Sequence, residues 1–453
     1  MSLIRAVSTI GGYTFLSRIF GFLRDMMVAS YLGAGFLADA FFVAFKLPNF
    51  LRRLFAEGAF NAAFVPLFAG TLEEQGKEAA KAFAEDIFSV LAAILFILVA
   101  VGLVFMPFVL LVFAPGFSSD PAKFDITVEL SRWTFPYIFF VSLVTLLSAI
   151  LNSMHKFANA AAAPILLNVT LMAALYFLSP HTKTAAHALA IGVFLAGIVQ
   201  LAWLYWGCKR AGLVPRLKWP RVTPQVKKLL MLAAPAAFGA GVAQVNLLID
   251  VIIGSMIPGA VSWLYYADRI NELPIGVIGV AIGTALLPML SRTIRGPNPE
   301  HALTQINHAL LVAMVVALPA TTGLITLALP ITRAIYEHGA FSPSDTAAVV
   351  PAMVAFAAGL PAFVLIKVLS PGFFARYDTK TPVKIGIVCL VINLIGNLSL
   401  MHVLGHVGLA LSTTLAGWVN ALSMGVILYK RGHFKPTPEI WHALGKALLA
   451  ALT

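Results

Sequence analysis

Charged residues are scarce in this sequence. Asp, Glu, Lys and Arg make up only 11% of its 453 residues, whereas 60% are apolar. A soluble domain has about 25% charged and about 45–50% apolar residues. Apolar stretches of about 20 residues, the length needed to cross a bilayer, recur along the whole chain, and its mean hydropathy is +0.91. The composition therefore excludes a soluble globular domain and predicts an integral membrane protein.

Cysteine is also scarce, and several motifs are missing. The two cysteines, Cys208 and Cys389, lie in or beside apolar stretches, which indicates buried apolar side chains and no disulfide framework. The first apolar stretch contains Arg18, Arg24 and Asp25, which a cleavable signal peptide would not tolerate. There is no P-loop GxxxxGK[ST], no HExxH and no Ser-His-Asp pattern, so ATP-driven transport and these hydrolase classes are not indicated.

The apolar stretches predict helices, because they do not alternate with polar residues as the strands of a membrane barrel would. We expect an all-α integral membrane protein. A thirteenth helix is expected to begin near 438, and we expect the chain to be cut off inside it because about 20 residues are needed to span. The twelve predicted spans lie near 8–32, 37–68, 84–113, 127–154, 158–179, 185–208, 228–254, 259–292, 302–328, 346–374, 383–402 and 406–429.

Basic residues are unequally divided between the predicted loops. With the N-terminus in the cytoplasm, nineteen Lys and Arg residues fall in cytoplasmic segments and four, Lys123 among them, fall on the opposite side. Cytoplasmic loops of membrane proteins carry such an excess of Lys and Arg. The bias predicts a multi-pass protein with a cytoplasmic N-terminus. It also explains much of the net charge of +12 without a nucleic-acid partner.

The chain repeats itself at an offset of 222 to 226 residues. Five positions match: Asp25 with Asp250, Pro48 with Pro274, Pro66 with Pro288, Gly116 with Gly339, and Asn168 with Asn393. Six helices per repeat is an even number, so both repeats insert with the same topology around a central cavity. The predicted parts are an N-terminal lobe at 1–208, a basic cytoplasmic linker at 209–228, a C-terminal lobe at 229–430, and the start of a C-terminal helix pair at 431–453.

Charged residues inside the predicted helices are the candidates for function. Each Arg or Lys at a helix centre costs about 2.5–3.5 kcal/mol on insertion scales, so these side chains must face water, each other or an anionic ligand. Cations outnumber acids in the set, which predicts an anionic cargo, and arginine suits phosphate or carboxylate. The candidate substrate-binding residues are Arg18, Arg24, Asp25, Asp39, Lys46, Arg52, Arg53, Glu57, Arg269 and Lys367.

Two questions stay open from the residues alone. Internal ion pairs would explain the same charges: Arg24 or Arg18 with Asp25, Arg53 with Glu57, and Arg269 with Glu272. The second question concerns a polar group formed by Asp250, Asn393, Asn397 and Thr413. Oxygen atoms of this kind hold Na⁺ or relay a proton, but Asn and Thr also form hydrogen bonds between membrane helices.

The stretch "DAFFVAFKLPNFLRRLFAEGAFNAAFVPLF" resembles the MurJ (MviN) family of lipid II flippases, within the multidrug/oligosaccharidyl-lipid/polysaccharide exporter superfamily. The resemblance continues in "SRIFGFLRD", "FAPGF", "WLYYADRINELPIGVIGVAIGTALLP" and "KVLSPGFFARYDTKTPVKI". It implies export of an undecaprenyl-diphosphate-linked peptidoglycan precursor by alternating access in the bacterial cytoplasmic (inner) membrane.

The resemblance also implies roles for residues. Arg18, Arg24, Arg52 and Arg269 match positions in the family's cationic cavity. Acidic positions near the cavity and its lateral portal are matched by Asp25, Asp39 and Glu57. Positions where some members bind Na⁺ are matched approximately by Asp250, Asn393, Asn397 and Thr413. Members normally have fourteen helices, and this sequence lacks most of the last pair.

The expected protein is a transporter and not an enzyme. It would be a monomer that meets lipid II, membrane lipids and cell-wall synthesis proteins, with Na⁺ or H⁺ as coupling ion and no other cofactor. Two rival functions remain. A drug or cation antiporter of the same superfamily should prefer acids in its cavity. A membrane enzyme acting on polyprenyl diphosphates should show clustered acidic metal ligands near one membrane face, and the sequence shows none.

Overall fold

The computed structural model describes residues 3–53, 60–298 and 300–436, together with 438, 442, 445 and 446. These residues form helices joined by short segments, and no strand occurs among them, so the all-α prediction is confirmed. Within the same residues, eight segments are long and apolar enough to cross a membrane. Glu57 and most of the predicted thirteenth helix lie outside the described residues.

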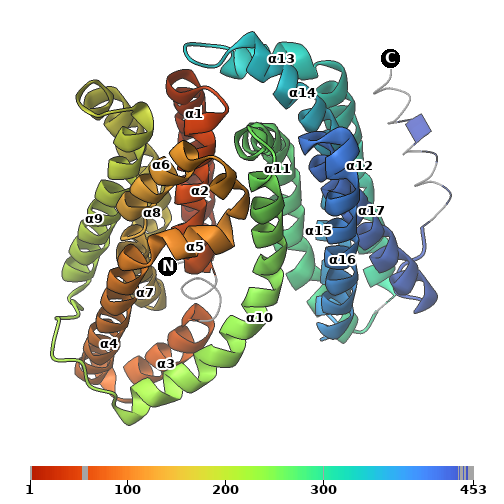
Figure 1. Ribbon diagram of the computed structural model, residues 1–453. Coiled ribbons are helices and arrows are strands. Elements are labelled where there is room, and N and C mark those ends of the chain that lie inside the picture. The colour runs from red at the N-terminus through yellow and green to blue at the C-terminus, as the bar shows by residue number, and fades with distance from the viewer. Residues whose placement is uncertain are drawn as a thin grey trace. The chain divides into compact units, whose positions relative to one another are not determined.

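Contacts divide the chain into two compact units, residues 1–256 and 257–453. Figure 1 shows the helices of the first unit, which are joined by short connections. Short 3₁₀ turns at Pro115–Ser119 (η2) and Ser179–His181 (η3) interrupt the series. The helices are α1 (Leu3–Leu32), α2 (Phe36–Leu51), α3 (Asn61–Glu74), α4 (Gly76–Val104), α5 (Met106–Phe113), α6 (Pro121–Thr134), α7 (Tyr137–Ser153), α8 (Phe157–Leu178), α9 (Ala185–Ala211) and α10 (Pro224–Ser255).

The second unit holds the remaining seven helices that the described residues form. A capping box begins α14, in which the Ser342 side chain accepts from the Asp345 backbone and the Asp345 side chain accepts from the Ser342 backbone. The helices are α11 (Ala260–Arg295), α12 (His301–Thr326), α13 (Ala328–Tyr336), α14 (Pro343–Ala357), α15 (Leu360–Phe374), α16 (Lys380–Leu404) and α17 (His406–Lys430).

Several predicted helices are each two helices in the structure, which corrects the sequence analysis. The stretch 84–113 breaks at Phe105, 127–154 breaks at Phe135, and 346–374 breaks at Ala358. The unpredicted α13 follows α12, and the predicted helix 37–68 includes residues 54–59, which lie outside the described residues. A proline lies within a few residues of each break where the chain is described (Pro107, Pro136, Pro361, Pro330). Proline lacks the N–H that continues a helix, and hydropathy alone does not register this loss.

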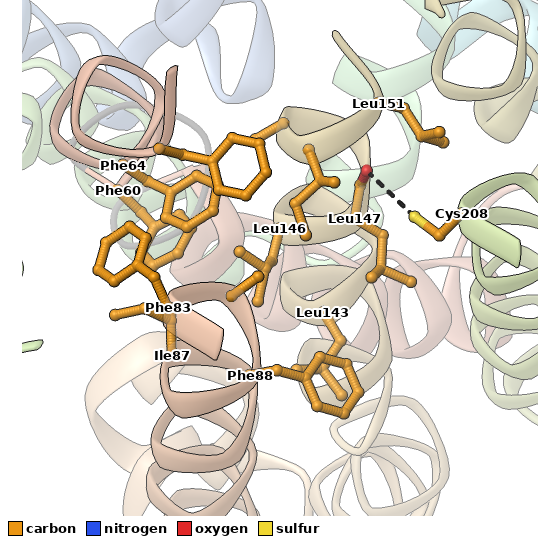
Figure 2. Packing of buried hydrophobic residues seen from close by; sticks show 14 of the residues in the cluster. Phe60, Phe64, Phe83, Ile87, Phe88, Leu143, Leu146, Leu147, Leu151 and Cys208 are labelled. Atoms are coloured by element: carbon orange, nitrogen blue, oxygen red, sulfur yellow. Dashed lines mark hydrogen bonds between the residues drawn. The ribbon is translucent and has the colours of Figure 1, made fainter. Parts of the chain in front are cut away.

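The core of the first unit lies between α4, α7 and α9. Phenylalanine rings stack from Phe60 through Phe64 to Phe83, with centroids 5.4 and 5.8 Å apart. Figure 2 shows Leu146 of α7 on the side of these rings, Leu143 beside Phe88, and Leu147 toward Cys208, whose Sγ donates to the Leu147 carbonyl. The cluster also includes Leu213, Val226 and Leu229. These three residues flank the segment 214–223, so both ends of the predicted linker are fixed in the core.

The two units repeat one order of elements. In the first unit, a long helix and a short one (α4–α5) are followed by a capped, broken pair (α6–α7) and then by two long helices (α8 and α9). The second unit has the same order of elements, in α12–α13, α14–α15, α16 and α17. The matched residues Gly116 and Gly339 each precede the broken pair. By this repeat α10 corresponds to α1, yet its contacts are with α2, α3, α4, α5 and η2 in the first unit. The predicted boundary between the lobes, at the linker 209–228, concerns which helices are repeated, and it stays a prediction. The contacts divide the chain at a different place, after Met256.

Candidate functional site

Arg24 and Asp25 of α1 form a buried ion pair. The Arg24 Nε and Nη2 atoms donate to Asp25 Oδ1 at 3.1 and 2.6 Å, and both side chains are buried. Neighbours in a helix do not normally face each other, but the long arginine side chain reaches back to the carboxylate. The internal-pairing alternative is therefore correct for Arg24, and its partner is Asp25.

The same guanidinium reaches a third residue, Asn168 of α8. Arg24 Nη1 donates to Asn168 Oδ1 at 3.0 Å, and Asn168 Nδ2 donates to the Ser17 carbonyl of α1 at 3.2 Å. Both ends of the asparagine amide therefore hold α8 against α1, and they fix the plane of the guanidinium. Sequence reasoning did not place Asn168 in the site, although its match with Asn393 in the repeat marked it as a polar position shared by both halves.

Asp39 of α2 pairs with Lys123 of α6. Lys123 Nζ lies 2.6 Å from Asp39 Oδ2, and Asp39 is 0% exposed. The ammonium also lies 4.3 Å from the centre of the Phe117 ring. Asp120 caps α6 by accepting from the Lys123 backbone N–H at 3.2 Å, which sets the position of the lysine. Sequence reasoning treated Lys123 as an ordinary loop cation, and no spacing in the chain could have paired residues this far apart.

The proline of α2 frees a carbonyl that a neighbouring helix satisfies. In an α-helix residue 48 would donate to the carbonyl of Ala44, but Pro48 has no N–H. The Thr134 hydroxyl at the end of α6 donates to that carbonyl at 2.7 Å, and Thr134 is buried. The bend predicted at Pro48 is thus held from the side by α6, four residues before the first of the predicted arginines at its C-terminal end.

We expect Thr134→Val to destabilise the protein by about 1–3 kcal/mol, because valine keeps the shape but removes the donor to a buried carbonyl. Thr134→Ser keeps the hydroxyl and serves as the matched control. Thermal unfolding of both variants in detergent measures the difference. Equal melting temperatures for the two variants would show that the hydroxyl does not support the bend.

Basic residues stand on both sides of Pro48, at the end of α2 and just beyond it. Lys46 and Arg52 are partly buried and Arg53 is exposed. Arg52 Nε donates to Asn49 Oδ1 at 3.3 Å, and the Asn49 amide donates to the Phe45 carbonyl at 2.8 Å. Arg52 and Arg53 have the wider π-helical geometry. The predicted partner of Arg53, Glu57, lies outside the described residues, so that ion pair stays untested.

In the second unit, the predicted pair on α11 is present. Arg269 Nη1 lies 2.7 Å from Glu272 Oε2, and the two side chains are 29% and 51% exposed. A pair this accessible to solvent contributes about 0–1 kcal/mol to stability. Lys367 of α15 is exposed. The arginine and the lysine therefore stay accessible to a ligand within this unit.

Five of the seven cations in the candidate set can be assigned to one of two groups. Arg24 and Arg269 have carboxylate partners, whereas Arg18, Arg53 and Lys367 are exposed and form no ion pair within 4 Å with any residue that the structure describes. Pairing therefore accounts for Arg24 and Arg269. The interpretation of the other cations as ligands of an anionic cargo stays a prediction.

The candidate ion-coupling residues divide between the units. Asn393 and Asn397 of α16 are buried, and Thr413 of α17 is partly buried. The Thr413 hydroxyl lies 3.5 Å from Asn393 Oδ1 and donates to the Leu409 carbonyl at 3.1 Å. Such neutral oxygen atoms are ligands that a hard cation accepts. Asp250 of α10, partly buried, belongs to the first unit.

Comparison with known proteins identifies the family. The family model described as "Lipid II flippase MurJ" matches residues 28–453. A "Probable lipid II flippase MurJ" of Rhizobium tropici is 45% identical over 437 residues, covering 96% of this chain and 82% of that protein. The "Lipid II flippase MurJ" of Burkholderia cenocepacia is 39% identical over 443 residues, covering 97% of this chain and 86% of that protein.

Solved structures give the same result. "Lipid II flippase MurJ, inward closed conformation" superposes with a TM-score of 0.83 at 28% identity, covering 98% of this chain and 90% of the other. An inward-facing multidrug resistance MATE family transporter of the MOP superfamily has a TM-score of 0.70 at 16% identity, covering 95% and 96%; this second likeness concerns the fold alone. The predicted resemblance is confirmed, and the chain belongs to the lipid II flippase MurJ family.

Proposed function

We propose that this protein moves lipid II, the undecaprenyl-diphosphate-linked peptidoglycan precursor, from the inner to the outer leaflet of the bacterial cytoplasmic membrane by alternating access. One observation supports it most: in this MurJ family member, Arg18, Arg53 and Lys367 are exposed cations without an ion pair among the described residues, and Lys367 lies in the segment Pro343–Phe374, which is long and apolar enough to cross a membrane. Such charges are expensive in lipid, and a diphosphate-bearing cargo gives them a partner.

The chemistry follows from the head group. A diphosphate cannot enter hydrocarbon without replacement of its water shell. Guanidinium groups offer paired N–H donors that match phosphate oxygens. Arg18, Arg52, Arg53 and Arg269 would bind these oxygens, and Lys367 would add a point charge. Arg24 would present a guanidinium whose plane Asp25 and Asn168 fix, while the polyprenyl tail stays in lipid.

The direction and the driving force also belong to the proposal. The Lys and Arg bias supports a cytoplasmic N-terminus, so the cargo would enter from the inner leaflet. Membrane potential contributes about 2.3 kcal/mol per elementary charge per 100 mV, and Na⁺ or H⁺ binding at Asp250, Asn393, Asn397 and Thr413 would reset the transporter. A monomer would suffice, with cell-wall synthesis proteins as candidate partners.

The test compares two arginines in similar ion pairs. Arg269 pairs with Glu272 on α11, and Arg333 pairs with Glu337 on α13 at 3.5 Å. Because both pairs are partly exposed, each alanine substitution should change stability by less than about 1 kcal/mol. We expect Arg269→Ala to abolish the lipid II that is accessible on the outer leaflet of cells depending on the variant, and Arg333→Ala to leave it unchanged.

Growth and surface-accessible lipid II are measured together with the amount of each variant in the membrane. Normal lipid II export with Arg269→Ala at normal abundance would contradict the proposed role of this residue. An equal loss with Arg333→Ala would show that any change in charge on these helices is harmful, and it would also contradict the proposal.

The rival functions are less well supported. The relatives are named as flippases, which are transporters and not enzymes. The antiporter likeness is limited to fold at 16% identity. Purified protein in vesicles separates the cases further: a flippase changes the leaflet accessibility of lipid II and leaves its covalent structure intact.

A further inference from the structure

The segment 212–223, between α9 and α10, carries exposed apolar and basic side chains in alternation. Trp219 is 84% exposed, Leu217 69% and Val222 68%. Arg216 and Arg221 are also exposed. Large apolar side chains outside the membrane-spanning helices normally pack in a core, and this segment does pack Leu213 at its start. The exposed face of the segment therefore needs a partner other than the core of its own unit.

The segment is held in place by α4. The Lys218 ammonium pairs with Glu85, whose Oε1 accepts the Arg216 backbone N–H at 3.4 Å. The Ser89 hydroxyl accepts the Lys218 backbone N–H at 2.9 Å. Glu85 is buried and stands just before the apolar run of α4 that begins at Ile87. The segment is thus fastened at the level where the hydrocarbon-spanning part of α4 begins.

The end of α9 indicates the same depth relative to the membrane. Tyr205 and Trp206 are about two-fifths exposed, and the Arg210 guanidinium lies 3.8 Å from the centre of the Trp206 ring. Tyrosine and tryptophan concentrate at membrane–water interfaces. A turn ends α9 at Gly212, whose φ is +71°, and the chain continues into the exposed segment. Both neighbouring helices therefore place residues 216–222 at the surface of the bilayer.

The charge of this region fits an anionic surface. Between residues 130 and 249 the sequence contains no Asp or Glu, while Lys209, Arg210, Lys227 and Lys228 add exposed cations beside Arg216 and Arg221. Clusters of Lys and Arg next to a membrane helix bind anionic lipid head groups, and amphipathic segments insert Trp and Leu into the head-group region. An acidic protein partner would satisfy the charges, but it would not explain the level set by α4 and α9.

We propose that residues 216–222 form a binding site for anionic phospholipid, with Trp219 and Leu217 inserted among the head groups and Arg216 and Arg221 bound to lipid phosphates. The site takes membrane lipid and not cargo, and it does not depend on transport. Its placement in the cytoplasmic leaflet rests on the proposed orientation.

The test uses the full chain in nanodiscs and an environment-sensitive fluorophore on Trp219→Cys. The native cysteines, Cys208 and Cys389, are buried and stay in place. Asn298→Cys, at an exposed residue between α11 and α12, is the matched control. Discs of phosphatidylcholine alone are compared with discs that also contain phosphatidylglycerol, and a lipid-borne quencher reports contact with lipid.

For the fluorophore at position 219 we expect a blue shift of the emission and quenching by the lipid-borne quencher. Both effects should increase with the phosphatidylglycerol content and decrease at high salt. For the fluorophore at position 298 we expect neither effect. Arg216→Gln with Arg221→Gln should reduce the lipid-dependent part by about half or more, while the Glu85–Lys218 contact is kept. Identical emission in both kinds of disc, or an equal response at 298, would overturn the proposal. A blue shift without quenching by lipid would assign the face to a protein contact and would overturn it as well.

Discussion

Asp39→Ala is expected to lower the free energy of unfolding by about 3–5 kcal/mol, because removing one partner leaves the Lys123 ammonium buried without a counter-charge. The carboxylate is fully buried and its distance to Lys123 Nζ is 2.6 Å. The Phe117 ring beside the ammonium offers only a weak substitute for the lost carboxylate. Denaturant or thermal unfolding in detergent measures the change.

Two controls decide what this loss means. Asp39→Leu combined with Lys123→Met should recover most of the stability, since replacing both members of a buried pair is often neutral. Lys183→Ala breaks the pair with Glu129, in which the side chains are 73% and 42% exposed, and should cost about 0–1 kcal/mol. If the double variant is as unstable as Asp39→Ala, the two side chains do not act as a pair.

The second large effect concerns Arg24, where a structural and a transport role can be separated. Arg24→Ala alone is expected to destabilise by about 3–5 kcal/mol, because it leaves the Asp25 carboxylate buried and unpaired by this arginine. Arg24→Met with Asp25→Leu removes both charges and should recover most of that stability. If the guanidinium binds the cargo, export of lipid II should still fall about tenfold or more, the value of a lost charged hydrogen bond.

Measurement of melting temperature and of outer-leaflet lipid II in the same preparation separates the roles. Recovery of stability without recovery of export supports cargo binding by Arg24. Recovery of both would show that Arg24 serves only to hold α1 against α8 through Asn168, and would remove it from the proposed path.

Part of the fold was readable from the sequence because it rests on composition and spacing. Apolar runs without alternation predicted the helices, and five matched positions predicted that the elements recur in one order. The helix breaks at Phe105, Phe135 and Ala358 were missed, because hydropathy averages over the prolines that cause them. The contacts of α10 with the first unit were not predictable either. The repeat places α10 at the start of the second lobe, because α10 matches α1, whereas in the structure its contacts are with helices of the first unit.

The candidate site also has features that the sequence predicted and features that it did not. Arg24 with Asp25 and Arg269 with Glu272 are neighbours along a helix, so spacing alone proposed both pairs, and both are present. Lys123 with Asp39 and Arg24 with Asn168 join residues from different helices. Such pairs depend on how helices pack, which a single sequence does not record. The roles of the candidate residues in binding cargo or ions stay predictions.

The packing of α10 has a consequence for biosynthesis. Val226 and Leu229 fill places in the core of the first unit, and the Gly116 backbone N–H donates to the Ser255 hydroxyl at 3.0 Å. A nascent chain that has reached only the end of α9 would therefore leave holes in that core. The first unit cannot finish folding until the ribosome has translated past Ser255, so its early helices must wait in the membrane, or with an insertase, for α10.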